Sequence, residues 1–519
     1  MYIGLFYKLL DGQKGEKNIK YAYINSGFPM KKWQYLLIAL TAVVVFFVVF
    51  KIHLDYHFPY HVDEWHHISE SIRLGNYGEY FQVLRMEQAN KFTGIEIGFH
   101  FFLFLFSFVF NLVSVYQFFP AIWAVLSILA LFFVIYKKSN NFWLAWLSIV
   151  FFASIKSNVN ITGIWFFTPL SFALPIIFLY FYFITEGIEK YNKKYLLVGM
   201  ALMLLLIPIH SISVLFSIPA LIVYCLFHYK KVLKNSLFIY LLLAVILAGL
   251  LFYKYVFGTT WLGIIPSIIY NVQFRYGWGV VEDKMSLFAL YSWIGYLLAV
   301  IGALFLIFKK EYKKYSIYLI WPIAVFCMMI IYRLTGVSYL SPYQRNLYYF
   351  IIALPFLSAF GFYSIIKWFL KIVDKIPLDI RYKYSVRDLT IFFVSAGVIF
   401  ITFFSYYYVS KRFELYRVVE KDDREMLTYL SQFPRSTVMA TPMISTAMFS
   451  IAHKDPVGDL VFYGNRKDVE AFYLSQSCDN PGKIIQKYNV KYIIAPFIID
   501  CDFSQLVYKN NSNYLYRVK

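Results

Sequence analysis

Charged residues are scarce in this sequence of 519 residues, of which 15% are charged and 60% are apolar. An ordinary soluble domain carries about 25% charged residues, so the composition excludes a soluble protein for most of the chain. The apolar residues gather in blocks long enough to cross a bilayer, which takes about 20 residues of helix. The first block, at 33–53, does not read as a signal peptide, because a polar stretch of 32 residues precedes it and no small-residue cleavage site follows.

Cysteines are few, and several catalytic motifs are missing. No HExxH zinc motif is present, and the C-terminal 109 residues hold neither a glycine-rich phosphate loop nor a nucleophile motif. Cys225 and Cys327 fall in apolar blocks, where a free cysteine is usually a small apolar residue. Cys478 and Cys501 fall in the C-terminal region, where an oxidising compartment would permit a disulfide. We predict that disulfide, with two buried thiols as the alternative.

The formal net charge of +20 does not indicate nucleic acid, because the basic residues form no stripe with interleaved aromatics. They cluster instead in short segments between apolar blocks, as the positive-inside rule predicts for cytoplasmic loops. The clusters are Lys137–Lys138, Lys190 with Lys193 and Lys194, Lys230 with Lys231 and Lys234, Lys309–Lys310 with Lys313 and Lys314, and 367–387.

Twelve apolar blocks can be recognised along the chain. They lie at about 33–52, 97–113, 117–136, 142–156, 164–184, 195–208, 212–227, 236–256, 287–308, 315–332, 346–366 and 388–409. If all twelve crossed, the lysine clusters would face outside. If the block at 98–113 instead lies along the surface or re-enters, about eleven helices cross and every cluster faces the cytoplasm.

The sequence therefore predicts an α-helical polytopic membrane protein with a cytoplasmic N-terminal segment, 1–32, and a transmembrane domain, 33–410. Residues 54–97 would form its first external loop. The remaining part, 411–519, predicts a small external α/β domain: helical patterns begin near Lys421, Ile444, Asp468 and Pro481, strands are expected at 436–440 and 490–495, and the first helix ends near Phe433. We assign no chemistry to this domain.

Acidic residues concentrate in the first external loop. It holds Asp55, Asp63, Glu64, Glu70, Glu79, Glu87 and Glu96 of the 29 acidic residues in the chain. If a helix begins near Asp63, residues 63, 67 and 70 share one of its faces, so aspartate, histidine and glutamate would converge beside the membrane. A carboxylate in that place can accept a proton from an attacking hydroxyl group.

Two other readings of the acidic loop stay open. Acidic residues at a helix start are also favoured by capping and by the helix dipole. Imidazole and carboxylate groups also bind divalent ions, but Glu64-x-x-His67 occurs as a single copy, whereas helical two-metal sites need two. We therefore assign no metal ligands and leave a divalent cation as a possible cofactor.

The run His61-x-Asp63-Glu64, followed by Glu70, stands directly after the first transmembrane block. It resembles the acidic motif of the GT-C superfamily of membrane glycosyltransferases, and most closely the His-Pro-Asp-Glu motif of its GPI- and dolichol-pathway mannosyltransferases. Val62 replaces the usual proline, and the looser Asp-Glu pattern also fits members that resemble protein O-mannosyltransferases and aminoarabinose transferases. The expected helix layout and outer C-terminal domain match the superfamily too.

The resemblance implies an inverting hexosyl- or pentosyltransferase whose donor is a sugar on a polyprenyl or dolichyl phosphate. The acceptor would be a hydroxyl of a glycan, lipid or protein. Asp63 would be the catalytic base, with Glu64 the supporting or alternative carboxylate. Arginine suits the leaving phosphate because its guanidinium binds oxygens in pairs. Candidate substrate-binding residues are Arg345, His67, Glu70, His61, Arg275, Arg333 and His210; snorkelling to headgroups is the alternative for the arginines.

His210, at the outer end of a short helix, could touch donor or acceptor, and a tight turn between two helices explains it as well. The rival functional class is a transporter or flippase of a lipid-linked or polar solute. Transporters usually place ionisable groups near mid-membrane and show paired broken helices, whereas here mid-helix charges are nearly absent and no internal repeat is evident. A non-enzymatic assembly subunit would not need the acidic cluster. We expect a multi-pass protein of the cell or endoplasmic-reticulum membrane, with its site on the outer or lumenal side.

Overall fold

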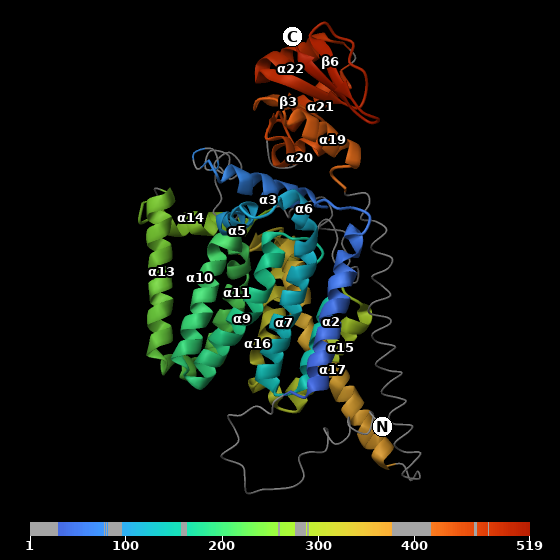
Figure 1. The fold of residues 1–519 in the computed structure, drawn as a ribbon. Helices are drawn as coiled ribbons and strands as arrows, with labels where there is room; N and C mark the ends of the chain where they lie inside the picture. Colours follow the sequence, from blue (N-terminus) through green and yellow to red (C-terminus); the bar gives the residue numbers. More distant parts are fainter. Residues whose placement is uncertain are drawn as a thin grey trace.

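The computed structural model describes residues 30–375 and 417–519, except 77, 79, 81–95, 157–162, 258–259, 276–286, 288–289, 461–463 and 476. Long helices form a bundle, and a small α/β unit covers one end of it (Figure 1). The predicted last transmembrane block, 388–409, and nearly all of the N-terminal segment 1–32 lie outside the described residues.

Six helical segments of the described part are long and apolar enough to cross a membrane: Lys32–His53, Leu112–Ser139, Pro169–Lys190, Lys193–Leu215, Ser316–Thr335 and Tyr343–Phe369. They contain α2 (Lys32–Phe50) with η1 (Lys51–His53), α6 (Leu112–Val115) with η2 (Tyr116–Phe118) and α7 (Phe119–Ser139), α9 (Pro169–Lys190), α10 (Lys193–Leu215), α16 (Ser316–Thr335) and α17 (Tyr343–Lys375). The chain is an integral membrane protein.

Shorter helices complete the bundle. They are α8 (Phe142–Ala153), α11 (Ser217–Phe227), α12 (Tyr229–Leu233), α13 (Ser236–Phe257), α14 (Ile264–Asn271), α15 (Trp293–Phe308) and η4 (Glu311–Lys313). In Figure 1, α13 and α15 run alongside the long helices, and α14 lies at the end that carries the α/β unit. The expected total of about eleven crossings remains a prediction.

The outward faces of the bundle are apolar. Leu36 and Phe47 of α2 are 61% and 62% exposed, and Leu243 of α13 is 56% exposed. Contiguous apolar surface of this kind is unfavourable in water. The same surface suits the hydrocarbon region of a bilayer, where helices satisfy their own backbone hydrogen bonds.

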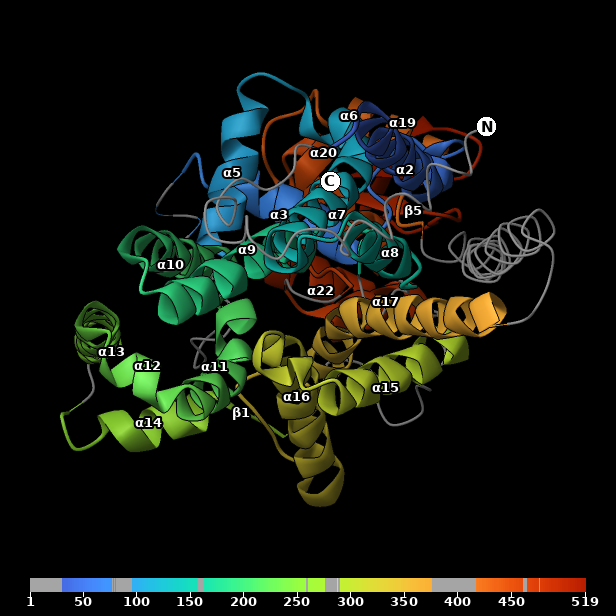
Figure 2. The ribbon, with the colours of Figure 1, turned by 90° about the horizontal axis from the view of Figure 1, so that it is seen from below.

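Close helix contacts inside the bundle depend on small residues. A Cβ atom on Gly302 of α15 would lie 2.0 Å from the carbonyl oxygen of Leu357 in α17, and one on Gly361 of α17 would lie 2.1 Å from that of Leu298. Figure 2 shows these two helices side by side. In lipid, where hydrophobic burial gives little drive to association, such backbone contact is a main source of helix packing.

The block predicted to lie on the surface or re-enter does not cross. Its helix, α5 (Ile97–Ser107), has 11 residues and therefore measures about 16 Å, roughly half of a 30 Å hydrocarbon core. It lies at the same end of the bundle as α6 and α3 (Val62–Arg73) (Figure 1). The predicted juxtamembrane character of this block is confirmed.

The C-terminal unit is an α/β layer, as the sequence predicts. Its five-stranded sheet has the order β4-β3-β5-β7-β6, with β3 parallel to β4 and β5, and β7 antiparallel to β5 and β6. The strands are β3 (Thr437–Met439), β4 (Asp455–Pro456), β5 (Val490–Ala495), β6 (Ser504–Lys509) and β7 (Tyr514–Val518); the helices are α19 (Lys421–Leu430), α20 (Pro442–Ala452), α21 (Arg466–Leu474) and α22 (Asp479–Tyr488).

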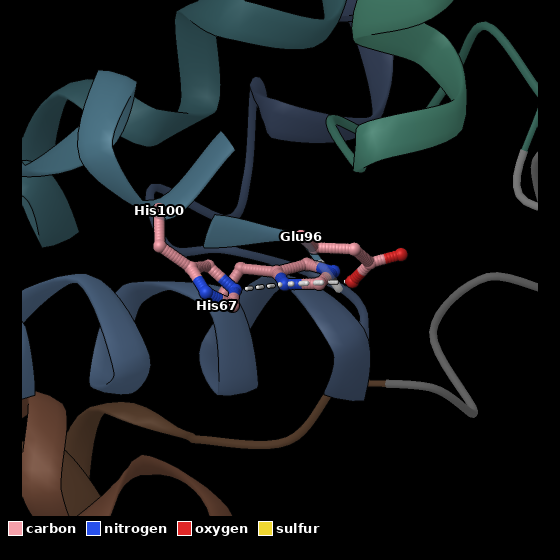
Figure 3. A group of neighbouring side chains, drawn as sticks. All are labelled: His67, Glu96 and His100. Carbon is pink, nitrogen blue, oxygen red and sulfur yellow. Dashed lines mark hydrogen bonds and ion pairs between the residues drawn. The ribbon is translucent and has the colours of Figure 1, made fainter. Parts of the chain in front are cut away.

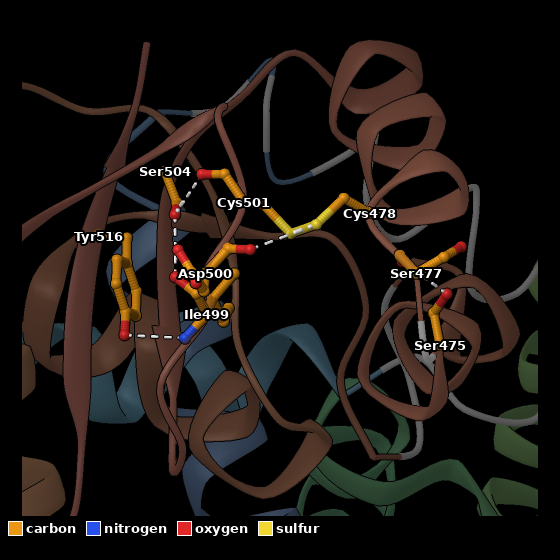
Figure 4. The surroundings of a disulfide bond; sticks show 8 residues. All are labelled: Ser475, Ser477, Cys478, Ile499, Asp500, Cys501, Ser504 and Tyr516. Atoms are coloured by element: carbon orange, nitrogen blue, oxygen red, sulfur yellow. Dashed lines mark hydrogen bonds between the residues drawn. A yellow bond between two sulfur atoms is a disulfide. The ribbon is translucent and has the colours of Figure 1, made fainter.

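Cys478 and Cys501 form the predicted disulfide, with 5.8 Å between their Cα atoms (Figure 4). It ties the start of α22 to the turn before β6. Ser504 Oγ donates to the carbonyl oxygen of Cys501 at 2.9 Å, and Tyr516 Oη accepts from the backbone N–H of Ile499 at 3.0 Å. The disulfide therefore reinforces a turn that already packs on the sheet.

The C-terminal unit packs on α3, which lies between it and the bundle (Figure 1). Ser69 Oγ in α3 lies 2.7 Å from Ser450 Oγ in α20. The guanidinium of Arg73 stacks 3.9 Å above the ring centre of Phe449. Close by, Tyr56 donates its hydroxyl proton to the carbonyl of Val419 at 2.7 Å. These contacts join the loop predicted to carry the chemistry to both parts of the protein.

Candidate active site

The predicted helix near Asp63 is α3, and His61 caps its N-terminus. His61 has extended backbone geometry, and its Nδ1 accepts the backbone N–H of Asp63 at 3.1 Å. An acceptor at this position satisfies one of the free N–H groups at a helix start. The Asp63 carboxylate lies 3.6 Å from the same His61 nitrogen, and its side chain is 24% exposed. Asp63 can therefore meet a substrate.

Glu64, the second carboxylate of the pair, lies in different surroundings. Its side chain is fully buried. Oε2 accepts backbone N–H groups from Tyr60 at 2.8 Å and His61 at 3.0 Å, and Oε1 accepts that of Phe167 at 2.7 Å. Burial raises the pKa of Glu64 to about 7, against the three N–H groups that favour its charged form. Both oxygens hold backbone together, so Asp63 is the better placed base.

His67 meets two side chains from the start of α5 (Figure 3). Its Nδ1 lies 3.0 Å from His100 Nε2 and 3.8 Å from Glu96 Oε2. On its other side, His100 Nδ1 lies 2.7 Å from the Tyr80 hydroxyl. Burial lowers the pKa of both imidazoles well below the usual value and raises the pKa of Glu96 to about 8. Without an ion, this group is held largely uncharged at neutral pH.

Arg345 and His210 complete the cluster from the bundle side. The charge of Arg345 opposes the rise in the pKa of Glu96, and that of Asp63 adds to it. His210 Nε2 lies 4.0 Å from Glu96 Oε1, and its Nδ1 lies 2.6 Å from Ser213 Oγ. Glu96 therefore stands between a buried arginine at the start of α17 and the acidic end of α3.

His210 reaches this place because α10 is kinked. The sequence suggested a short helix ending before a turn at this residue, but α10 continues to Leu215. Pro208 lies inside the helix, and His210 has non-helical angles, φ −160° and ψ 83°. Proline removes a helical hydrogen bond and bends the helix, which turns His210 toward Glu96.

Other predicted residues have protein partners. Glu70 Oε1 lies 3.4 Å from Arg73 Nε, toward the C-terminal unit, so residue 70 does not converge with residues 63 and 67 as expected. Arg333 Nε donates to the Tyr343 hydroxyl at 2.8 Å. Arg275 is exposed and directly follows β1 (Gln273–Phe274), which pairs with β2 (Ser338–Tyr339) just before α17. A substrate-binding role for these residues stays a prediction.

The sequence reasoning did not assign roles to Glu96, His100 or Tyr80. A signal was present: Glu96 and His100 are four residues apart, the spacing of one helix face, at the edge of an apolar block. The C-terminal unit also reaches the site, because the charge of Asp459 partly offsets the burial that lowers the pKa of His66 to about 4. That contact joins parts of the chain nearly 400 residues apart, which no local pattern predicts.

The fold and this cluster define the class: the chain has the GT-C fold of membrane glycosyltransferases, as its resemblance predicted. No known sequence family and no curated protein matches the chain. Among solved structures, ArnT from Cupriavidus metallidurans in the apo state is similar, with a TM-score of 0.53, 13% identity and coverage of 93% of this chain and 97% of that one. Its form bound to undecaprenyl phosphate gives 0.52, 12%, 94% and 98%.

A second similar structure is the Archaeoglobus fulgidus oligosaccharyltransferase tethered to an acceptor peptide containing the NVT sequon. It gives a TM-score of 0.52 and 13% identity, and the match covers 90% of this chain and 69% of that one. At such identities the likeness establishes the fold. The roles of individual residues have to be argued from this chain's own geometry.

Proposed function

We propose that this protein is a glycosyltransferase that moves a sugar from a polyprenyl-phosphate-linked donor to a hydroxyl group of a glycan, lipid or protein, with inversion at the anomeric carbon. The observation that carries the proposal is the cluster at one end of a GT-C bundle, where an accessible carboxylate, Asp63, lies near the buried arginine Arg345. Similar structures bound to undecaprenyl phosphate and to an acceptor peptide support a lipid-linked donor and a separate acceptor.

The proposed reaction needs one base and one cation. Asp63 takes the proton of the acceptor hydroxyl as its oxygen forms a bond to the anomeric carbon. The bond between that carbon and the phosphate oxygen breaks, and the electron pair leaves with the lipid phosphate. Arg345 stabilises the charge that develops on the phosphate. His61 holds the backbone of Asp63 in place from the helix cap.

A transporter or flippase is supported less well. Glu186, a buried acid of α9, is paired with Lys138 and, at 2.6 Å, with Lys190, which is the last residue of that helix. This pairing lies at a helix end, whereas transport sites usually place ionisable groups near mid-membrane. The ionisable cluster described above lies at the opposite end, beside the C-terminal unit (Figure 1).

We also propose that the site and the C-terminal unit face the outside of the cell or the lumen. Two observations support this orientation. The basic segments that separate the apolar blocks fit cytoplasmic loops, and a disulfide between Cys478 and Cys501 fits an oxidising compartment.

The proposal is tested by complementing a deletion strain with plasmid-borne variants and analysing lipid-linked sugars and glycans by mass spectrometry. We expect the deletion to accumulate a lipid-linked sugar and to lack one sugar on an acceptor glycan, lipid or protein. Wild type and Asp55→Asn, a matched change at an exposed aspartate of the same loop, should restore the product. Asp63→Asn should not, because losing a general base costs about 10²- to 10⁴-fold in rate.

Arg345→Ala should also fail to restore the product, with the donor accumulating, because the leaving phosphate loses its cation. Immunoblots of membranes establish that all variants are inserted at equal levels. If Asp63→Asn restores normal product, Asp63 is not the base. If the deletion changes no lipid-linked sugar and no glycan, the glycosyltransferase proposal is wrong.

A further inference from the structure

Three potential metal ligands converge in the site. The Nδ1 or Nε2 atoms of His67 and His100 and a carboxylate oxygen of Glu96 all lie within 4.8 Å of one another (Figure 3). The two closest separations to His67 Nδ1 are 3.0 Å and 3.8 Å. Ligands of a tetrahedral zinc ion with bonds of about 2.0–2.1 Å stand about 3.3 Å apart. The group has this size without rearrangement of the backbone.

The kind of ligand fits a transition metal. Two imidazoles and one carboxylate are a set found in catalytic zinc sites, which leave a fourth position open. Imidazole favours zinc and its first-row neighbours, whereas magnesium and calcium prefer oxygen ligands only. The Tyr80 hydroxyl, 2.7 Å from His100 Nδ1, can accept a proton there. That contact fixes the tautomer in which His100 Nε2 is free to bind an ion.

A simple hydrogen bond accounts for only part of this arrangement. One proton can join His67 Nδ1 to His100 Nε2, but Glu96 Oε2, at 3.8 Å from the same nitrogen, is then beyond hydrogen-bond distance. A cation between the three groups interacts with all of them at once. The side chains of His67 and His100 are almost fully buried, so water competes little for the position.

We propose that His67, Glu96 and His100 bind one divalent transition-metal ion, with zinc as the best-fitting choice. This inference deepens the proposed function, and its possible catalytic value rests on that function: a bound ion would supply positive charge close to Asp63 and the donor phosphate. Metal binding itself can be measured without any transfer reaction.

The experiment uses the full-length protein, purified in detergent, stripped with a chelator and then reloaded. Stripped protein is mixed with zinc ions, passed through a desalting column and analysed for metal by mass spectrometry. We expect wild type to retain about one zinc per chain. His67→Asn, Glu96→Gln and His100→Asn should each retain far less. His57→Asn is the matched control, since His57 is exposed in the same loop and contacts Gln117.

A second measurement does not depend on the variants. Cobalt ions added to stripped wild type should give the visible absorption of a tetrahedral nitrogen–oxygen site, and zinc should remove it. The proposal is overturned if wild type retains no zinc above the level of buffer. It is equally overturned if the three variants, eluting as intact protein, retain as much zinc as His57→Asn, because the ion would then bind elsewhere.

Failure of this proposal can be told apart from failure of the proposed function. Product formation by protein that binds no zinc rejects the metal site and keeps the glycosyltransferase. Zinc retention by a protein whose deletion changes no lipid-linked sugar keeps the metal site and rejects the glycosyltransferase.

Discussion

Glu64 is the third residue of α3, where its carboxylate accepts backbone N–H groups from Tyr60, His61 and, across the fold, Phe167. The capping motif explains the first pair of bonds, since a glutamate at this position commonly reaches back to the cap residue. The bond to Phe167 also fixes the segment before α9 against α3. Glu64 thus positions the helix on which Asp63 stands.

We predict that Glu64→Gln lowers stability, whereas Asp63→Asn mainly lowers rate. A glutamine offers one acceptor oxygen, so its NH₂ group would face a backbone N–H and leave that buried donor unpaired, which costs about 1–3 kcal/mol. Thermal unfolding of the purified protein, followed by tryptophan fluorescence, measures the change. Asp63→Asn serves as the control because its side chain is partly exposed.

A Glu64→Gln protein that melts like wild type but has lost product formation would contradict this division of roles. In that case Glu64 would take part in the chemistry, as the alternative assignment of the acidic pair expects. Restored activity in Glu64→Asp would not decide the matter, because the shorter side chain also changes the cap.

Single residues were predictable where a local pattern carries their role. The acidic pair after the first apolar block pointed to Asp63, and the i, i+4 spacing placed His67 on the same side of the helix. Glu96 and His100 come from α5, and nothing local brings that helix against α3. Their part in the site depends on tertiary packing, which also explains why Glu70, although spaced correctly, contacts Arg73 instead.

The element that organises the site is α3, because it contacts both the bundle and the C-terminal unit. Arg73 lies between Glu70, at 3.4 Å, the Phe449 ring, at 3.9 Å, and Asp455, at 3.9 Å. Arg435 also binds Asp455 through two nitrogens at 2.9 Å. A buried arginine with both a ring and carboxylates around it resists movement of the helix.

We predict that cysteines at positions 69 and 450 form a disulfide. The serine hydroxyls at these positions are 2.7 Å apart, so sulfur atoms placed there would meet. The double variant is built in a chain with Cys225→Ser and Cys327→Ser, the other two free cysteines. Mass spectrometry of peptides from unreduced protein should find the 69–450 link, with Ser69→Cys paired with Ser475→Cys as the control that stays unlinked.

Failure of the 69–450 pair to link under mild oxidation would mean that α20 does not rest on α3 in the membrane. Because Asp459 reaches His66 from the same unit, the site would then lose one of its walls. Activity of the linked protein adds a second reading. Unchanged product formation would indicate that the two elements stay together throughout the reaction.

The native disulfide is a prediction at the same scale. Cys478 and Cys501 are 23 residues apart in sequence, and closing such a loop stabilises a fold by about 3 kcal/mol in the chain-entropy account. Cys478→Ser with Cys501→Ser should therefore lower the unfolding temperature of the C-terminal unit, while Cys225→Ser should not. Alkylation of both native thiols without prior reduction would contradict the prediction.

Element prediction succeeded where the apolar pattern is strong. The β-branched run 490–495 is β5, with the expected bounds, and it is the most buried strand of the sheet. β6 and β7 were not predicted. In β6, residues 504–509 are all at least partly exposed, because this strand forms one edge of the sheet, and an exposed edge strand lacks the alternation that identifies a strand.

On the scale of the whole molecule, composition predicts the membrane class, and charge placement predicts the orientation. Neither predicts how the helices pack, since that depends on contacts such as the close approach at Gly302 and Gly361. Charge placement did identify the short block that does not cross. A helix of 11 residues at 97–107 agrees with that inference, whereas hydropathy alone would have counted it as a crossing.

The orientation follows from the same charge argument, and it places the site with the C-terminal unit on the outer side. A single cysteine replacing Lys467, an exposed residue of α21, should react with a membrane-impermeant thiol reagent added to intact cells, after native cysteines other than the disulfide pair are replaced. A cysteine replacing Lys310, exposed at the opposite end of the bundle, should react only after the membrane is opened. Because both positions are exposed, accessibility to solvent cannot explain a difference between them. Labelling of position 310 from outside, with position 467 protected, would reverse the orientation and place Asp63 in the cytoplasm, where a donor on the outer leaflet could not reach it.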